Sequence, residues 1–144
     1  MNNLQFLSFS ELPKEAMYIR ETVFVHEQGF TEEFDLDDSS ALHIIAYSNG
    51  IPVGTCRIIT RDAEMNLYMI GRVAVLKEYR SYGIGSKLIL SAEEHIKCKS
   101  VKKATVLIHS QLRVAEFYEK LGYIRTGESD SEQGCPHVML KKEI

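Results

Sequence analysis

A short glycine-containing segment carries the clearest chemical signal in the chain. Arg80, Gly83 and Gly85 form an Arg-x-x-Gly-x-Gly pattern between an apolar stretch and a helical one. Two glycines one residue apart let backbone N–H groups approach a ligand without a Cβ in the way, and a helix N-terminus carries partial positive charge. The segment therefore predicts a cradle for an anion such as a pyrophosphate.

Two common nucleotide-binding motifs do not match this cradle. It lacks the Lys and hydroxyl residue of the P-loop pattern GxxxxGK[ST], and its glycine spacing differs from the GxGxxG of dinucleotide-binding folds. ATP and NAD are therefore disfavoured as ligands. A helix start that only uses flexible glycines is the alternative interpretation.

The elements that must position the cradle are a strand before it and a helix after it. Residues 66–75 have the composition of a strand, and Ile84, Leu88, Ala92 and Ile96 recur at helical spacing. We therefore expect a helix from about residue 84 to 97.

The rest of the chain shows a similar alternation of short periodic segments. A helix is expected from an N-cap at Ser10, with Pro13 in its first turn, to about Phe24 or Val25. Asn49-Gly50 is a strong hairpin signal, and an acidic irregular loop is expected at 27–40. The other expected elements are strands at 4–9, 42–47, 53–60, 104–108, 123–127 and 137–141, and a helix at 112–121. This order, β-α-β-β-β-α-β-α-β-β, predicts an α+β (mixed α/β) fold.

Composition narrows the class of protein. The 144 residues are 44% hydrophobic and 26% charged, which predicts a single globular domain over 1–144. The formal net charge of -3 leaves no broad basic surface for nucleic acid. No apolar stretch approaches the roughly 20 residues that span a bilayer, and no secretory signal is evident, so we expect no membrane partner and a cytoplasmic address.

Cysteine and histidine usage predicts no metal site. The three cysteines are widely spaced and fit neither a disulfide framework nor a zinc CxxC pair, so we expect reduced thiols. No two of the five histidines have the i, i+4 spacing of a zinc-binding helix.

A second strand–helix unit follows the cradle and ends in Gln111-x-x-Val114-x-x-Phe117-Tyr118. With the cradle, it resembles the GNAT acetyltransferase superfamily, whose corresponding helix reads N-x-x-A-x-x-F-Y; Gln111 and Val114 depart from that pattern. Further matches resemble the ElaA/YjcF-like branch, and together they cover nearly the whole chain. They are the segments 23–28 and 134–137, the acidic loop up to 37–38 followed by His43, and 52–55 with Arg57.

The resemblance implies a GNAT-like fold and acetyl-CoA as cosubstrate. The fold is a central mixed, mostly antiparallel sheet of about six to seven strands flanked by helices. One strand pairs with the pantetheine arm and the cradle holds the pyrophosphate. The implied cofactor-binding residues are Val73, Ala74, Val75, Arg80, Ser81, Tyr82, Gly83, Ile84, Gly85, Ser86, Gln111, Phe117 and Tyr118.

The family transfers an acyl group from CoA to a primary amine, in most members by direct attack within a ternary complex. The resemblance assigns proton donation to the leaving thiolate to Tyr118, and the thioester carbonyl to a backbone N–H near Val73. A tyrosine that serves only as core is the alternative for Tyr118.

The base that accepts the amine proton is left open by the sequence. Glu27 is the first candidate, because a partly buried Glu can have the raised pKa that a base needs. His43 and His109 follow, and a route through water with no single base is the other alternative.

The candidate acceptor-binding residues are Glu27, Asp37, Arg72 and His137. Carboxylates attract an ammonium group, and Arg72 suits a substrate carboxylate, which favours a small amine such as an amino acid, a polyamine or a peptide end. In the alternative, Asp37 is solvated and Arg72 forms an internal salt bridge with one of these acids, Glu27 or Asp37.

A noncatalytic CoA-binding or sensing module, and a peptide or protein N-terminal acetyltransferase, are the competing functions. A homodimer is the expected assembly, through pairing of C-terminal strands.

Overall fold

The computed structural model describes residues 3–31 and 33–144, and its main elements have the predicted order. The strands are β1 (Leu4–Phe9), β2 (Leu42–Ser48), β3 (Ile51–Asp62), β4 (Leu67–Val75), β5 (Thr105–Gln111), β6 (Ile124–Glu132) and β7 (Cys135–Glu143). The α-helices are α1 (Lys14–Arg20), α2 (Ile84–Lys99) and α3 (Ala115–Glu119). A π-helix, η1 (Glu21–Glu27), continues α1, and three short 3-10 turns are η2 (Leu36–Ser39), η3 (Lys77–Tyr79) and η4 (Leu112–Val114).

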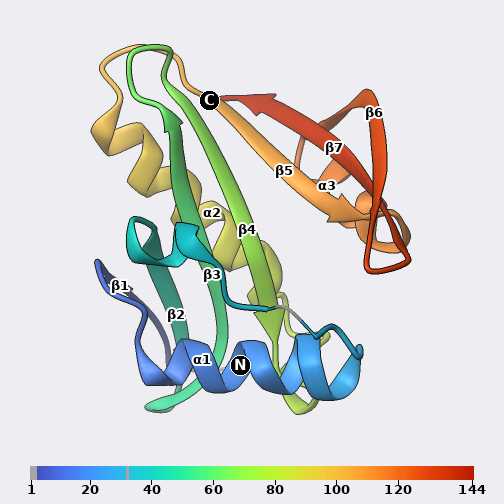
Figure 1. Ribbon diagram of the computed structural model, residues 1–144. Helices are drawn as coiled ribbons and strands as arrows, with labels where there is room; N and C mark the ends of the chain where they lie inside the picture. The colour runs from blue at the N-terminus through green and yellow to red at the C-terminus, as the bar shows by residue number, and fades with distance from the viewer. Residues whose placement is uncertain (1–2, 32) are drawn as a thin grey trace.

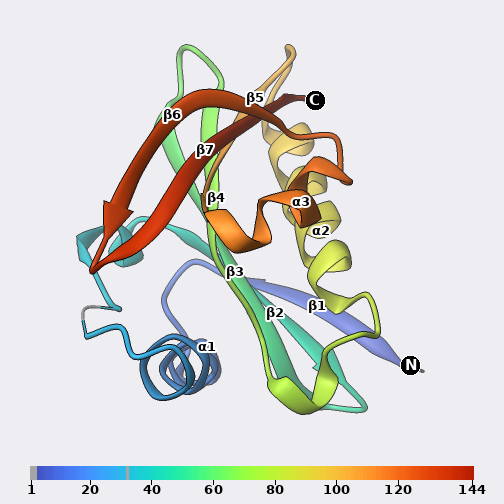
Figure 2. The same cartoon turned by 90° about the vertical axis from the view of Figure 1, so that its right-hand side faces the viewer.

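All seven strands join one sheet in the order β1-β2-β3-β4-β5-β7-β6. Only β4 and β5 pair in parallel, and every other neighbouring pair is antiparallel. Helix α1 covers one face of the sheet, whereas α2 and α3 lie on the other (Figure 2). The predicted α+β class, with a mixed and mostly antiparallel sheet, is confirmed.

A fork between the two parallel strands is the feature that matters most for function. Strands β4 and β5 pair only over 67–69 and 105–107, near the start of each. Beyond these pairs the strands diverge, so the sheet opens into two halves (Figure 1). From about residue 71 onwards, one edge of the β4 backbone has no partner strand among the described residues.

Apolar packing holds the sheet between its helices. The predicted helical stripe Ile84, Leu88, Ala92 and Ile96 is buried against strand residues of the sheet. A smaller cluster under α1 includes Ile19 and packs on the opposite face of the same sheet. The middle of β3 is consequently buried on both faces, as is typical of a central strand covered by helices on both sides.

The first helix begins later and ends later than predicted. Ser10 is not its N-cap: Pro13 occupies that position with an extended backbone (φ -80°, ψ 156°), and the helix starts at Lys14. The residue before a proline is disfavoured in the helical region, which disfavours a helix that already includes Leu12. Its end is a π-helix that runs to Glu27, beyond the expected Phe24 or Val25.

The C-terminal elements also differ in length from the prediction. Strand β5 runs to Gln111, and β6 and β7 each have nine residues. The helix expected at 112–121 is divided into η4 and the short α3. Gly122 follows with a φ of 99°, in the left-handed position expected of a helix-ending glycine.

Candidate active site

A cavity of about 590 Å³ occupies the fork between β4 and β5. Its walls come from both faces of the sheet: Phe24 and Glu33 lie on the side of α1, and Gly85 and Tyr118 on the side of α2 and α3. The cavity therefore reaches through the sheet, and a ligand held in it is accessible from both layers.

The predicted anion cradle forms one end of this cavity. Gly83 is the N-cap of α2 with a left-handed φ of 78°, so the N–H groups of the first turn of the helix are available to a ligand. The cavity-lining residues of this segment are Arg80, Ser81, Gly83, Ile84, Gly85 and Ser86. Tyr82, also predicted to bind cofactor, is not among the lining residues, and 52% of its surface is exposed.

Gly85 is needed where the cradle meets α3. A Cβ built on it would lie 3.2 Å from Cζ of Phe117, a residue that lines the same cavity. Unlike Gly83, Gly85 has no positive φ, so the need for glycine here comes from space. The residues present thus leave a narrow passage that a larger side chain would fill.

A β-bulge lies in β4 beside the fork. Gly71 is opposite Arg57 and Ala74 is opposite Thr55, so β4 contains one more residue than β3 over this stretch. Arg72 takes up the irregularity with a left-handed φ of 50°. Bulges of this kind re-aim the backbone, here at the level of Val73, which lines the cavity together with Ala74 and Val75.

Tyr118 lines the cavity from α3. The residue is 7% exposed, and its ring meets Phe117 edge-on, with centroids 5.0 Å apart. Burial raises the pKa of the phenol well above its usual value, so the hydroxyl stays protonated at neutral pH. A protonated phenol in a cavity is suited to give a proton to a leaving group.

Glu27 lines the cavity but is bound to the cradle arginine. Its two carboxylate oxygens accept hydrogen bonds from Nη1 and Nη2 of Arg80 at 2.6 and 2.8 Å. This hydrogen bonding by Arg80 lowers the pKa of Glu27, so the raised pKa expected of a base is not found. The pair instead links the π-helix to the cradle, and Arg80 also donates from Nε to the carbonyl of Val75 at 2.9 Å.

Arg72 lines the cavity and forms salt bridges with residues of the same chain. Its Nε lies 3.0 Å from Oε2 of Glu33, and its Nη2 lies 3.2 Å from Oδ2 of Asp35. Arg72 therefore forms an internal salt bridge, with Glu33 and Asp35 rather than with Glu27 or Asp37. Its pairing with a substrate carboxylate stays a prediction.

Asp37 is not among the residues that line the cavity, so the structure does not bring it together with the other predicted acceptor residues. It lies on the 3-10 turn η2, where its side chain is 41% exposed and 3.8 Å from Arg61. Its neighbour Asp38 turns inward instead. Of the other predicted acceptor residues, His137 lines the cavity from β7.

A buried network anchors the acidic loop beneath the cavity. Asp38 accepts hydrogen bonds from Nη1 of Arg20 at 2.8 Å and from Nη1 of Arg57 at 2.9 Å. Arg20 also binds Glu33 at 2.8 Å, and Arg57 binds Asp35 through both terminal nitrogens. Positive and negative charges alternate through this network, which fixes the wall of the cavity formed by Glu33.

Several lining residues were not anticipated as site residues. They come from the C-cap of the π-helix, the loop after it, the 3-10 turn η4 and the β6–β7 hairpin, and include Gln28, Phe30, Glu33, Arg113, Val114, Glu132 and Gln133. Two contacts join these segments: Gln111 donates to Gln28 at 2.8 Å, and Gln133 accepts from the N–H of Thr31 at 2.8 Å. Gln28 and Val114 belong to segments that resemble the family, but the exposed, polar β6 gave no signal that its hairpin lines the cavity.

Comparison with known proteins identifies the family. Residues 11–144 match the family described as acetyltransferase (GNAT) domain. The chain belongs to the GNAT acetyltransferase family. This GNAT domain is 37% identical over 137 residues to the uncharacterized protein YyaT of Bacillus subtilis, covering 90% of this chain and 88% of YyaT. It is 30% identical over 147 residues to protein ElaA of Escherichia coli, covering 97% and 95% of the two chains.

Solved structures agree with this assignment. A putative N-acetyltransferase from Lactobacillus plantarum superposes on the GNAT domain with a TM-score of 0.86 at 28% identity, covering 99% of both chains. The crystal structure of E. coli ElaA gives a TM-score of 0.83, also at 28% identity and 99% of both chains. The predicted resemblance to the ElaA/YjcF-like branch is confirmed, and with it the class of N-acetyltransferase.

Two further observations concern the described part of this GNAT domain. No helix in it has the length and apolar character that crossing a membrane requires. Over the same residues, 3–31 and 33–144, no three His, Cys, Asp or Glu side chains are grouped as metal ligands.

Proposed function

We propose that the protein transfers an acetyl group from acetyl-CoA to the primary amine of a small molecule, with both substrates bound at once. The observation that carries this proposal is the cavity that passes through the sheet at the β4–β5 fork. A thioester held in the fork is open to the acceptor from the side of α1, while its sulfur faces Tyr118 on the other side.

The residues of the cavity fit acetyl-CoA. The first turn of α2 and its glycines suit a pyrophosphate, and the unpaired edge of β4 offers N–H and C=O groups to the amides of a pantetheine arm. A solved GNAT acetyltransferase from Elizabethkingia anophelis with acetyl-CoA bound has the same fold, with a TM-score of 0.73 at 19% identity. Acetyl-CoA supplies the activated acyl group, a thioester that an amine can attack.

The chain's own groups then have distinct tasks. The backbone N–H near Val73, at the bulge of β4, is placed to donate to the carbonyl oxygen as negative charge develops on it. Tyr118 holds the proton that the departing sulfur requires. The Glu27–Arg80 pair keeps the π-helix against the cradle and so positions the acceptor side relative to the cofactor side.

Blocking the passage at Gly85 tests the placement of acetyl-CoA. Gly85→Leu is expected to weaken acetyl-CoA binding about 100-fold, because the new side chain meets Phe117 and occupies cavity space that the cofactor requires. Isothermal titration calorimetry measures the affinity. Glu94→Leu, at an exposed position of the same helix, is the matched control. Equal affinity of the Gly85→Leu and wild-type proteins would remove the cradle from the binding site.

The proposed activity is tested by thiol release from acetyl-CoA. The purified protein is assayed with amino acids, polyamines, aminoglycosides and short peptides, alongside a control without acceptor. One class of amine is expected to raise the rate well above the control, with the acetylated amine as product. Binding of acetyl-CoA without release by any amine would instead favour a noncatalytic CoA-binding module, and stimulation by peptides alone would favour N-terminal acetylation.

A further inference from the structure

A histidine on the acceptor side of the fork is placed to take the amine proton. We propose that His109 is the general base of the reaction and that Asp130 orients it. This inference rests on the proposed function and names the residue that the sequence leaves open among Glu27, His43, His109 and water.

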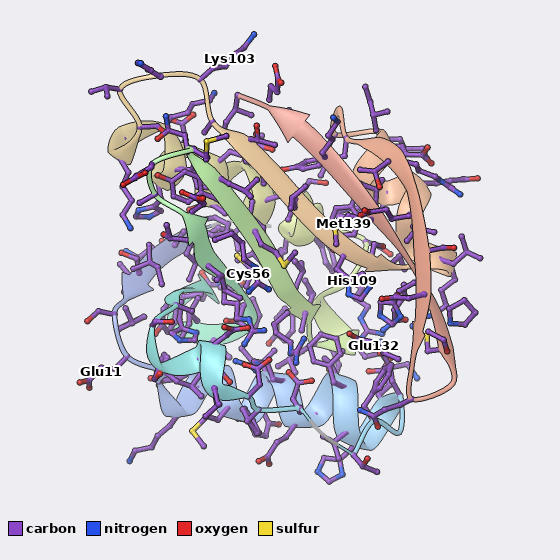
Figure 3. The ribbon with its side chains drawn as sticks, turned by 45° about the horizontal axis from the view of Figure 1, so that its top comes forward. Glu11, Cys56, Lys103, His109, Glu132 and Met139 are labelled. Atoms are coloured by element: carbon purple, nitrogen blue, oxygen red, sulfur yellow. The ribbon has the colours of Figure 1, made fainter. Side chains whose placement is uncertain are left out.

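The position of His109 follows from the alternation of side chains along β5. Val106 and Ile108 point into the core that packs against α2, so His109 points to the opposite face, where the acceptor enters. His109 lines the cavity and keeps 21% of its side chain exposed. In Figure 3 it lies near the end of β5, with Glu132 close by on the β6–β7 hairpin.

The partners of His109 determine which of its nitrogens can accept a proton. Nε2 lies 2.8 Å from Oδ1 of Asp130. Because an ionised carboxylate only accepts hydrogen bonds, we assign the hydrogen of the neutral ring to Nε2, which leaves Nδ1 as the nitrogen that can accept a proton. Nδ1 lies 3.6 Å from Oε1 of Glu132. An imidazolium formed on His109 would thus have a carboxylate beside each nitrogen.

Other ionisable groups also surround His109. The ring of His137, on the neighbouring strand β7, lies 4.7 Å from that of His109 between centroids. Asp130 and Glu132 face it from β6, and Glu33 and Arg72 line the same cavity from the acidic loop and β4. Asp130 and Glu132 are more than half exposed, so a proton on His109 has a short route to water.

The competing bases are occupied or misplaced. Glu27 is bound to Arg80. Burial raises the pKa of Glu33, but its Oε2 accepts a hydrogen bond from Arg20 and lies 3.0 Å from Nε of Arg72. His43 is buried under the acidic loop, where Nε2 contacts the carbonyl of Asp38, and it does not line the cavity.

His137 is the nearest rival to His109. Its Nδ1 contacts the carbonyl oxygen of Cys135 at 2.9 Å, so it also has one nitrogen free. A carboxylate holds the ring of His109, whereas the ring of His137 contacts a backbone carbonyl, and His137 is more buried than His109. We therefore assign the proton transfer to His109, whose ring is both oriented and more accessible.

The proposed step conserves atoms and charge. The amine nitrogen forms a bond to the carbonyl carbon, the carbon–sulfur bond breaks, and one N–H proton moves to Nδ1 of His109. Tyr118 gives its proton to the sulfur. The proton on His109 then returns through water to the phenolate of Tyr118, which leaves the acetylated amine, CoA and the starting protein.

The test compares His109→Gln with wild type over a range of pH, using the amine that gives the highest rate of thiol release. His109→Gln is expected to lower kcat/KM about 100-fold and to abolish the decline of wild-type activity toward acidic pH. Its affinity for acetyl-CoA is expected to match wild type by calorimetry. Added imidazole is expected to restore activity to His109→Ala, a result that a purely structural role would not give.

Asp130→Asn is expected to lower kcat/KM about tenfold, because the imidazole ring of His109 loses the carboxylate that orients it.

The controls are His95→Gln, on α2 outside the cavity, and His137→Gln. His95→Gln is expected to behave as wild type. Activity of His109→Gln within threefold of wild type, or loss of the acidic limb in His137→Gln instead, would overturn the assignment to His109 alone. A wild-type protein that acetylates no amine would overturn the proposed function as well.

Discussion

Replacing Tyr118 by phenylalanine is expected to lower kcat for acetyl transfer about 1000-fold, within the range that general acid catalysis contributes. The substitution removes one oxygen atom and keeps the ring that packs against Phe117 and Tyr123. The affinity for acetyl-CoA is expected to stay within a factor of about two, since the hydroxyl acts on the leaving sulfur and not on binding. Steady-state kinetics and calorimetry measure the two quantities.

The control for this experiment is Tyr18→Phe, at an exposed position on α1. It is expected to leave both kcat and affinity unchanged. A second check repeats the kcat comparison with amines of different basicity. Loss of the acid affects the expulsion of sulfur and not the ionisation of the amine, so the effect of Tyr118→Phe is not expected to follow the basicity of the amine. Unchanged turnover in Tyr118→Phe would reduce Tyr118 to a core residue, the alternative that the sequence allowed.

Replacing Asp38 by alanine is expected to lower the free energy of unfolding by about 3 kcal/mol, the low end of the range for breaking a buried ion pair by removing one partner. The substitution leaves the guanidinium groups of Arg20 and Arg57 buried without the carboxylate that joins them. Glu33 and Asp35 still bind these arginines and keep the loss at the low end. Urea denaturation measures the change, and Asp37→Ala, one residue away and exposed, is the matched control.

The same network makes stability depend on pH in a defined direction. Burial alone would raise the pKa of Asp38, but hydrogen bonds and charges from Arg20 and Arg57 lower it to about 2. A pKa below the unfolded value of about 3.9 means that stability is fully present above pH 4 and is lost as pH falls toward 2. Asp35, whose pKa is also lowered, acts in the same direction, whereas the raised pKa of Glu33 acts in the opposite one.

The contribution of Asp38 is obtained by comparison with Asp38→Asn. The difference in unfolding free energy between wild type and Asp38→Asn is expected to shrink as pH falls from 5 to about 2. A constant difference over this range would show that the carboxylate is not held ionised by the two arginines.

The order of elements was predictable because it depends on local signals. Asn49 and Gly50 both have positive φ, as a tight hairpin turn requires, and the stripe from Ile84 to Ile96 is buried as its spacing indicates. The cradle was predictable for the same reason, since its glycines, its strand and its helix are adjacent in the sequence.

The pairing of charges was not predictable, because it joins residues far apart in the chain. Glu27 meets Arg80 across 53 positions, and this contact reverses the direction of the pKa shift that burial alone suggested. Asp37 and Asp38 are chemically alike neighbours, and only the tertiary structure decides that Asp38 faces Arg57. The π-helix and the bulge at Arg72 likewise depend on packing against other elements.

We propose that the β4–β5 fork holds the thioester between Tyr118 and the acceptor side. A crystal structure of the protein with CoA would give the distance between the CoA sulfur and the Tyr118 hydroxyl oxygen. We expect a distance of about 3.5 Å or less, within hydrogen-bonding reach of sulfur, with the pyrophosphate on the first turn of α2. A sulfur atom outside the fork, or a pyrophosphate away from residues 81–86, would contradict it.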